Sequence, residues 1–179
     1  MVKWVLVALV VGVSLLVWRS ATKANDATPK AGNIAPIFTL PDQAGKARSI
    51  EDFRGKWLIL YFYPKDDTPG CTEEACMFRD DLYKLTTLGA EVVGISVDDT
   101  LSHASFAKKY RLPFPLLSDE SGEVAARYGS LRNFGFLKIA KRNTFVIDPQ
   151  GKVERVYLSV STSKNSQEVI EDLKKLSGK

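Results

Sequence analysis

The sequence of 179 residues is poor in the residues that build disulfide frameworks and metal sites, since it contains two cysteines and one histidine. Two thiols exclude a disulfide-framework domain and a four-thiolate metal site, and with one histidine they cannot form a standard structural zinc site. The sequence also has no internal repeat and no low-complexity tract. Cys71 and Cys76 are therefore expected to act as a close pair.

A strong excess of charge of one sign is missing as well. The formal net charge of the chain is +4, with 25 basic residues. Three of these, Lys3, Arg19 and Lys23, precede the first acidic residue, Asp26, so the rest of the chain is close to neutral. A nucleic-acid-binding domain carries a basic patch or stripe, which this composition does not provide. We therefore expect no nucleic-acid partner.

Only one long apolar run is present, from Trp4 to Trp18, between Lys3 and Arg19. As a helix it would be about 22 Å long, shorter than the ~30 Å hydrocarbon core of a bilayer. The flanking tryptophans and cations favour a membrane anchor over residues 1–20, with the domain facing the periplasm or exterior. A cleaved signal peptide, leaving an exported soluble domain, and a buried helix remain as alternatives, although no clear cleavage motif follows the run and it has no polar face.

The rest of the chain divides into a linker and one domain. Residues 21–33 predict a flexible linker, and residues 34–179 are expected to form the domain. In it, Trp57–Tyr63 and Glu91–Val97 predict buried strands, and Thr144–Leu158 predicts a β-hairpin. Helical stretches alternate with these runs, which predicts an α/β fold with a central mixed β-sheet and helices on both faces, besides the N-terminal hydrophobic helix.

The spacing of apolar residues predicts the helices. They are expected from about Cys71 to Leu88, from Ser102 to Tyr110, over Glu123–Tyr128 and from about Ser166 to Leu176. His103 falls in the polar part of the second helix, far from the cysteines in sequence, and is expected at the surface.

Both cysteines follow the strand Trp57–Tyr63, in the segment PKDDTPGCTEEAC. Cys71 is expected at a helix N-terminus, where backbone N–H groups and the helix dipole favour the thiolate, although free cysteines are also often buried apolar residues. The hydroxyl of Thr68 either bonds the sulfur or an incoming oxygen, or caps the helix, and Pro64 stiffens the turn. This arrangement predicts that Cys71 is a nucleophile.

The spacing of the cysteines limits what they do together. Five residues along an ideal helix separate two Cα atoms by roughly 8.7 Å, whereas a disulfide needs about 7 Å or less. If Cys71 and Cys76 pair, the first turns of the helix must unwind; otherwise Cys76 is a small core residue. The spacing is also not that of a C-x-x-C exchange motif.

From about Gly32 onward the chain resembles a peroxiredoxin, and YFYPKDDTPGCTEEAC is similar to the bacterioferritin-comigratory-protein (PrxQ) branch. The family's Pro-x-x-x-Thr-x-x-Cys motif is matched by Pro64, Thr68 and Cys71, and FRDDLYKL and TFVIDPQGKV extend the likeness. The resemblance implies a thioredoxin-like fold that reduces hydrogen peroxide and organic hydroperoxides without metal, haem or flavin.

The resemblance also implies roles for single residues. Cys71 would be the peroxidatic cysteine and Cys76 the resolving one, joined in an intramolecular disulfide that thioredoxin or a thioredoxin-like donor reduces. Arg142, in KRNTFVID, would be the pocket arginine, with a surface salt bridge as its alternative role. The branch further implies a monomer.

The stretch YGSLRNFGFLKIAKR departs from the branch, because it is short and lacks the Trp-Gly-Glu-Lys stretch often found there. The edge of the substrate pocket and the reductant docking site therefore stay open. Phe134, Phe136 and Leu137 either form an exposed apolar rim or pack over the core. Two other functions remain: a membrane-tethered thiol–disulfide exchange protein, and a metal carrier such as a thioredoxin-like copper chaperone.

Overall fold

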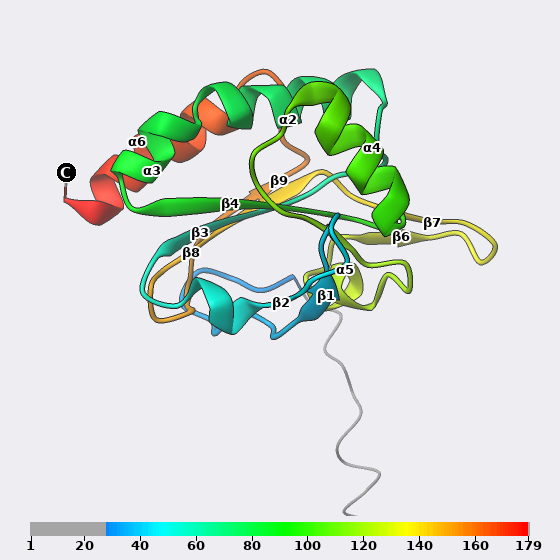
Figure 1. Cartoon of the computed structure of the whole chain (residues 1–179). Coiled ribbons are helices and arrows are strands. Elements are labelled where there is room, and N and C mark those ends of the chain that lie inside the picture. The colour runs from blue at the N-terminus through cyan, green and yellow to red at the C-terminus, as the bar shows by residue number, and fades with distance from the viewer. Residues whose placement is uncertain (1–27, 179) are drawn as a thin grey trace, which may run out of the picture.

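A five-stranded sheet in the order β5-β4-β3-β8-β9 forms the centre of the computed structural model, which describes residues 28–178 (Figure 1). Its strands are β3 (Trp57–Phe62), β4 (Ala90–Ser96), β5 (Leu116–Ser118), β8 (Asn143–Ile147) and β9 (Val153–Leu158). The first three run parallel, whereas β8 is antiparallel to β3 and β9 to β8. The sheet is therefore mixed, and this part of the prediction is confirmed.

Strand β3 is central and buried on both faces. Ile59 and Tyr61 point into one hydrophobic core, whereas Leu58 and Leu60 point into the other. Successive side chains of a strand alternate between faces, so a strand covered on both sides needs a continuous apolar run. The run WLILYFY meets that requirement.

Helices cover one face of the sheet, and a smaller layer covers the other (Figure 1). The first face carries α2 (Pro69–Asp80), α3 (Leu82–Thr87), α4 (Thr100–Tyr110) and α6 (Asn165–Ser177). The second carries the hairpin of β1 (Thr39–Pro41) and β2 (Ala47–Ser49), the 3-10 turn η1 (Ile50–Phe53) and the short helix α5 (Glu123–Arg127). Helices thus lie on both faces, but unequally.

The helix expected from Cys71 to Leu88 is interrupted at Asp81. There α2 ends and α3 begins, and the buried Asp81 carboxylate accepts hydrogen bonds from Ser166 Oγ (2.8 Å) and Lys84 Nζ (2.7 Å). Ser166 belongs to the first turn of α6, so a contact distant in sequence fixes the break.

The hairpin of β6 and β7 was not predicted from the sequence. Strands β6 (Leu131–Asn133) and β7 (Lys138–Ala140) pair in antiparallel fashion and project beyond the sheet (Figure 1). At the turn, Phe134 is 59% and Phe136 96% exposed. The apolar side chains therefore form an exposed rim and do not pack over the core.

The predicted N-terminal helix and anchor, residues 1–20, lie outside the described residues. Between residues 28 and 178, none of the helices combines the length and the apolar character needed to cross a membrane. The end of the predicted linker already contacts the sheet, because the Gly32 N–H donates to the Val153 carbonyl (2.8 Å).

The prediction that His103 lies at the surface is wrong. Its side chain is fully buried on α4, and its Nδ1 lies 2.8 Å from Asp66 Oδ2. The helical pattern around it is polar, but a carboxylate 37 residues earlier in the chain supplies a partner inside the protein. A buried polar group is tolerated when it is hydrogen-bonded.

Candidate active site

The loop from β3 into α2 places Cys71 at the carboxyl end of the central strand. Helix α2 has Thr68 as its N-cap and Pro69 as its first residue, so Cys71 occupies the third helical position. The N–H groups of a first turn have no partners within their helix and carry the positive end of its dipole. Cys71 is a free thiol and only 1% exposed.

Arg142 approaches the sulfur of Cys71 from the neighbouring strand. Its Nη2 donates a hydrogen bond to Cys71 Sγ at 3.3 Å. The sheet register explains this approach, because Asn143 pairs with Phe62 and the residue before β8 therefore lies beside the loop that follows β3. The structure thus brings together the two residues that the resemblance to the peroxiredoxins placed in one pocket.

Glu74 completes this group and was missed by sequence reasoning. It lies one helical turn after Cys71, is fully buried, and accepts a hydrogen bond from Arg142 Nη1 at 2.5 Å and one from Asn165 Nδ2 at 3.0 Å. The spacing in the sequence could have indicated it, because Glu74 follows Cys71 by three residues and residues three apart share one face of a helix. That face of α2 also carries the buried Phe78.

Burial and pairing act in opposite directions on these charges. Burial raises the pKa of Glu74 above its ordinary value, although Arg142 and Asn165 oppose the shift. Burial by itself lowers the pKa of Arg142, but the charge of Glu74 and the contact with Cys71 raise it above its ordinary value. Arg142 therefore remains a permanent positive charge beside the sulfur.

Thr68 and Pro64 border the same site. The Thr68 hydroxyl donates to the carbonyl of Lys65 at 3.0 Å and makes no capping hydrogen bond, so neither of its two predicted hydrogen bonds is seen. Pro64 and Arg142 line a cleft of about 480 Å³, together with Phe134, Ile139 and Val160. The cleft thus joins the surroundings of the cysteine to the apolar rim.

Cys76 lies on α2 as well, half-buried and free. Both cysteines are part of one regular helix, so the geometry of an ideal helix applies to them. A disulfide between them requires that helix to open.

A protein-family model described as the AhpC/TSA family matches residues 31–156. The chain belongs to the AhpC/TSA family. A relative from Coxiella burnetii that is named "Putative peroxiredoxin bcp" is 47% identical over 145 residues, which are 79% of this chain and 96% of that protein. The chloroplastic peroxiredoxin Q of Triticum aestivum is 52% identical over 126 residues, 70% of this chain but only 58% of the plant protein.

Solved structures of AhpC/TSA relatives agree with this fold. The peroxidoxin BcpB of Mycobacterium tuberculosis has a TM-score of 0.79 and 38% identity, covering 83% of this chain and 98% of that one. The Xanthomonas campestris bacterioferritin comigratory protein, solved in work on its alkyl peroxide reduction, has a TM-score of 0.73 and 30% identity over 78% of this chain and 92% of that one. The predicted resemblance to the bcp and PrxQ peroxiredoxins and the thioredoxin-like α/β fold are confirmed.

The predicted location at a membrane, with the domain facing the periplasm or exterior, is contradicted by the comparisons. The plant relative is named chloroplastic, and the Coxiella relative matches over 96% of its own length. The prediction depended only on residues 1–20, that is, on the apolar run of Trp4–Trp18 and the cations that flank it.

Proposed function

We propose that this chain is a thiol peroxidase that reduces hydrogen peroxide and organic hydroperoxides. The observation that carries the proposal is the contact between Arg142 Nη2 and Cys71 Sγ at the N-terminus of α2. A cationic donor at the sulfur and the first-turn N–H groups beside it can stabilise negative charge that develops when a cysteine acts as a nucleophile. Membership of the AhpC/TSA family supports the same chemistry.

In the proposed first step the Cys71 thiolate attacks one oxygen of the peroxide. A sulfur–oxygen bond forms, the oxygen–oxygen bond breaks, and the leaving oxygen takes up a proton and departs as water or an alcohol. Arg142 and the first-turn N–H groups of α2 stabilise the negative charge that moves to the leaving oxygen. The Thr68 hydroxyl is proposed as a further donor, which requires that it turn from the Lys65 carbonyl to the leaving oxygen. Cys71 is left as a sulfenic acid.

In the proposed second step Cys76 resolves that sulfenic acid. Its sulfur bonds to the Cys71 sulfur, water leaves, and an intramolecular disulfide remains. Because both cysteines lie on α2, the helix opens in this step and Glu74 leaves its buried position. Thioredoxin or a thioredoxin-like dithiol then reduces the disulfide by thiol exchange, so the cycle uses no cofactor.

The cleft beside Arg142 supports organic hydroperoxides as substrates. Phe134, Ile139 and Val160 give it an apolar wall. A hydroperoxide whose reacting oxygens lie at Cys71 could place its carbon chain against these side chains, and burying that chain favours binding.

The test is turnover by the full chain in the presence of thioredoxin, thioredoxin reductase and NADPH. NADPH oxidation that depends on added hydrogen peroxide or cumene hydroperoxide, and that disappears in Cys71→Ser, is the expected result. Reduction of insulin by the reduced chain without any peroxide, with no peroxide-dependent NADPH oxidation, would instead indicate a thiol–disulfide exchange protein and overturn the proposal.

A further inference from the structure

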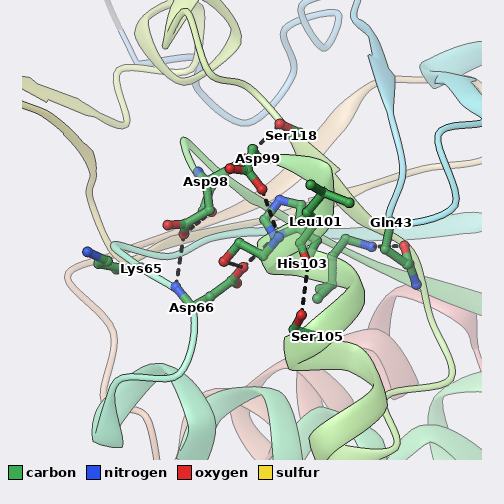
Figure 2. A network of polar contacts seen from close by, with 12 residues as sticks. Gln43, Lys65, Asp66, Asp98, Asp99, Leu101, His103, Ser105 and Ser118 are labelled. Atoms are coloured by element: carbon green, nitrogen blue, oxygen red, sulfur yellow. Dashed lines mark hydrogen bonds and ion pairs between the residues drawn. The ribbon is translucent and has the colours of Figure 1, made fainter.

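Helix α4 contacts the loop before α2 at two places, and the chemistry proposed above uses neither of them. Asp66 and Asp67 lie between Pro64 and Thr68, in the loop that leads from β3 to Cys71. Figure 2 shows Asp66 beside His103, where the first turns of α4 approach the loop. The last turn of α4 holds Asp67.

The first contact is a buried hydrogen-bond network around Asp66. The Asp66 carboxylate accepts hydrogen bonds from Tyr63 (2.7 Å) and from Ser102 Oγ (2.7 Å), and its Oδ2 lies 2.8 Å from His103 Nδ1. The Asp66 N–H donates to Asp98 Oδ2 at 2.9 Å, which ties the loop to the end of β4 as well (Figure 2). Asp66 is 7% and His103 0% exposed, so this anchor is inside the protein.

The second contact is at the surface and holds a strained residue. Asp67 has a φ of 56°, the left-handed conformation that residues with a side chain seldom adopt. Its carboxylate is bound by Lys109 Nζ at 2.6 Å and by the Tyr110 hydroxyl at 2.6 Å. Such a conformation persists only when its surroundings hold it.

The two contacts fix the backbone immediately before the helix that carries Cys71. None of these hydrogen bonds includes a residue of α2 itself. Opening of the first turns of α2 therefore breaks none of these side-chain hydrogen bonds. Further along, α2 also reaches α4 through Arg79, whose Nη1 donates to the Tyr110 carbonyl at 2.6 Å.

We propose that His103 and Tyr110, near the two ends of α4, are positioning residues for the peroxide step. Through Asp66 and Asp67 they hold the Thr68 hydroxyl and the first-turn N–H groups of α2 where the reacting oxygens bind. This inference rests on the proposed peroxidase function. It predicts that the rate of Cys71 oxidation by peroxide depends on the α4 contacts, whereas the rate of disulfide formation with Cys76 does not.

The experiment begins at the exposed contact, where the fold is least at risk. In the full chain, Lys109→Met combined with Tyr110→Phe removes the partners of Asp67 and leaves the aromatic ring in place. The second-order rate constant for oxidation by hydrogen peroxide is expected to fall about tenfold, because small displacements of positioned groups are costly to a reaction rate. Disulfide formation and alkylation of Cys71 by iodoacetamide are expected not to slow.

The buried contact is tested by rescue. His103→Leu removes the donor to Asp66, whereas His103→Asn keeps an N–H donor on a short side chain. Peroxide oxidation is expected to slow in the leucine variant and to recover, at least in part, in the asparagine variant. Lys108→Met is the matched control for Lys109→Met at the exposed contact, since Lys108 is an exposed cation on the same helix with no hydrogen bond to the loop.

The outcomes separate this inference from the function on which it depends. If the unchanged chain does not react with peroxide, the proposed function fails. If it reacts and the Lys109→Met, Tyr110→Phe variant matches it within about twofold, the positioning role is wrong. An equal slowing of peroxide oxidation, alkylation and disulfide formation would also overturn the inference, because it would indicate general loss of structure.

Discussion

Arg142 and Glu74 form an ion pair next to Cys71, with Arg142 Nη1 2.5 Å from Oε2 of the buried Glu74. Arg142 enters from the turn before β8, whereas Glu74 and Cys71 both lie on α2. One guanidinium therefore holds the acid and the thiol of the same helix at once. In the proposed resolving step α2 opens, and this ion pair is then expected to break.

Arg142→Lys tests whether the fork of the guanidinium matters. Lysine keeps the positive charge, but a single ammonium group does not reproduce the planar fork that contacts Glu74 and Cys71 together. We expect the second-order rate constant for hydrogen peroxide, measured by stopped flow, to fall by about 10²-fold, as for the loss of one donor to a developing oxyanion.

Lys141→Met is the control for this substitution. Lys141 is the neighbouring cation, and its Nζ donates to the Gly129 carbonyl rather than to the sulfur. Its rate constant is expected to stay within a few-fold of the unchanged chain. A Lys141→Met rate as low as that of Arg142→Lys would show that general charge in the cleft, and not the contact with Cys71, drives the reaction.

The raised pKa of Glu74 predicts a pH dependence of stability. A carboxyl whose pKa is higher in the folded state holds its proton more tightly there than in the unfolded chain. Its contribution to stability is complete below the ordinary value of 4.5 and is lost as the pH rises through the folded-state value. The reduced chain should therefore lose stability, relative to Glu74→Gln, as the pH rises from about 4.5.

Thermal unfolding midpoints of the reduced chain and of Glu74→Gln, measured between pH 4 and pH 7, check this. Glu73→Gln is the matched control, because it makes the same substitution on the exposed side of the same helix. A difference for Glu74→Gln that stays constant, or that moves in favour of the unchanged chain as the pH rises, would contradict the assignment.

The lowered pKa of Asp81 predicts a pH dependence of stability opposite to that of Glu74: its contribution is lost as the pH falls. Burial alone raises the pKa of Asp81, but hydrogen bonds from Lys84, Ser166 and Gln167 bring it below the ordinary value. Asp81→Asn should destabilise the fold by about 2 kcal/mol at pH 7, because it weakens a buried network that joins α2, α3 and α6. The effect should shrink as the pH falls below about 4, where the carboxylate becomes protonated.

Denaturant unfolding measures this effect, with Asp80→Asn as the control. Asp80 is exposed and pairs with Arg79, so its replacement should cost less than about 0.5 kcal/mol. Equal costs for the two substitutions would show that the Asp81 network does not hold the helices together.

The sequence was sufficient for the parts of the site that local chemistry and strand order determine. The apolar run of β3 predicted the central strand, and the turn residues after it predicted where Cys71 lies. Both predictions depend on residues that are adjacent in the chain. The pocket position of Arg142 was implied by the resemblance to the peroxiredoxins, through the strand β8 that follows it.

The missed features depend on partners that are far apart in sequence. The spacing from Cys71 placed Glu74 on the cysteine's face of the helix, but nothing near Glu74 or His103 in the sequence identifies their partners, Arg142 and Asp66. The break at Asp81 depends on Ser166, and the β6–β7 hairpin has strands of three residues, too short for a periodic pattern. Polarity alone therefore predicted exposure where a buried partner decides otherwise.

The central claim is that one peroxide molecule oxidises Cys71 and that Cys76, on the same helix, then forms a disulfide with it. The direct test counts free thiols in the full chain before and after one equivalent of hydrogen peroxide, alongside Cys71→Ser and Cys76→Ser. We predict rapid loss of both thiols in the unchanged chain, no reaction in Cys71→Ser, and a sulfenic acid trapped at Cys71 in Cys76→Ser. Survival of both thiols, or loss no faster than that of free cysteine, would contradict the account.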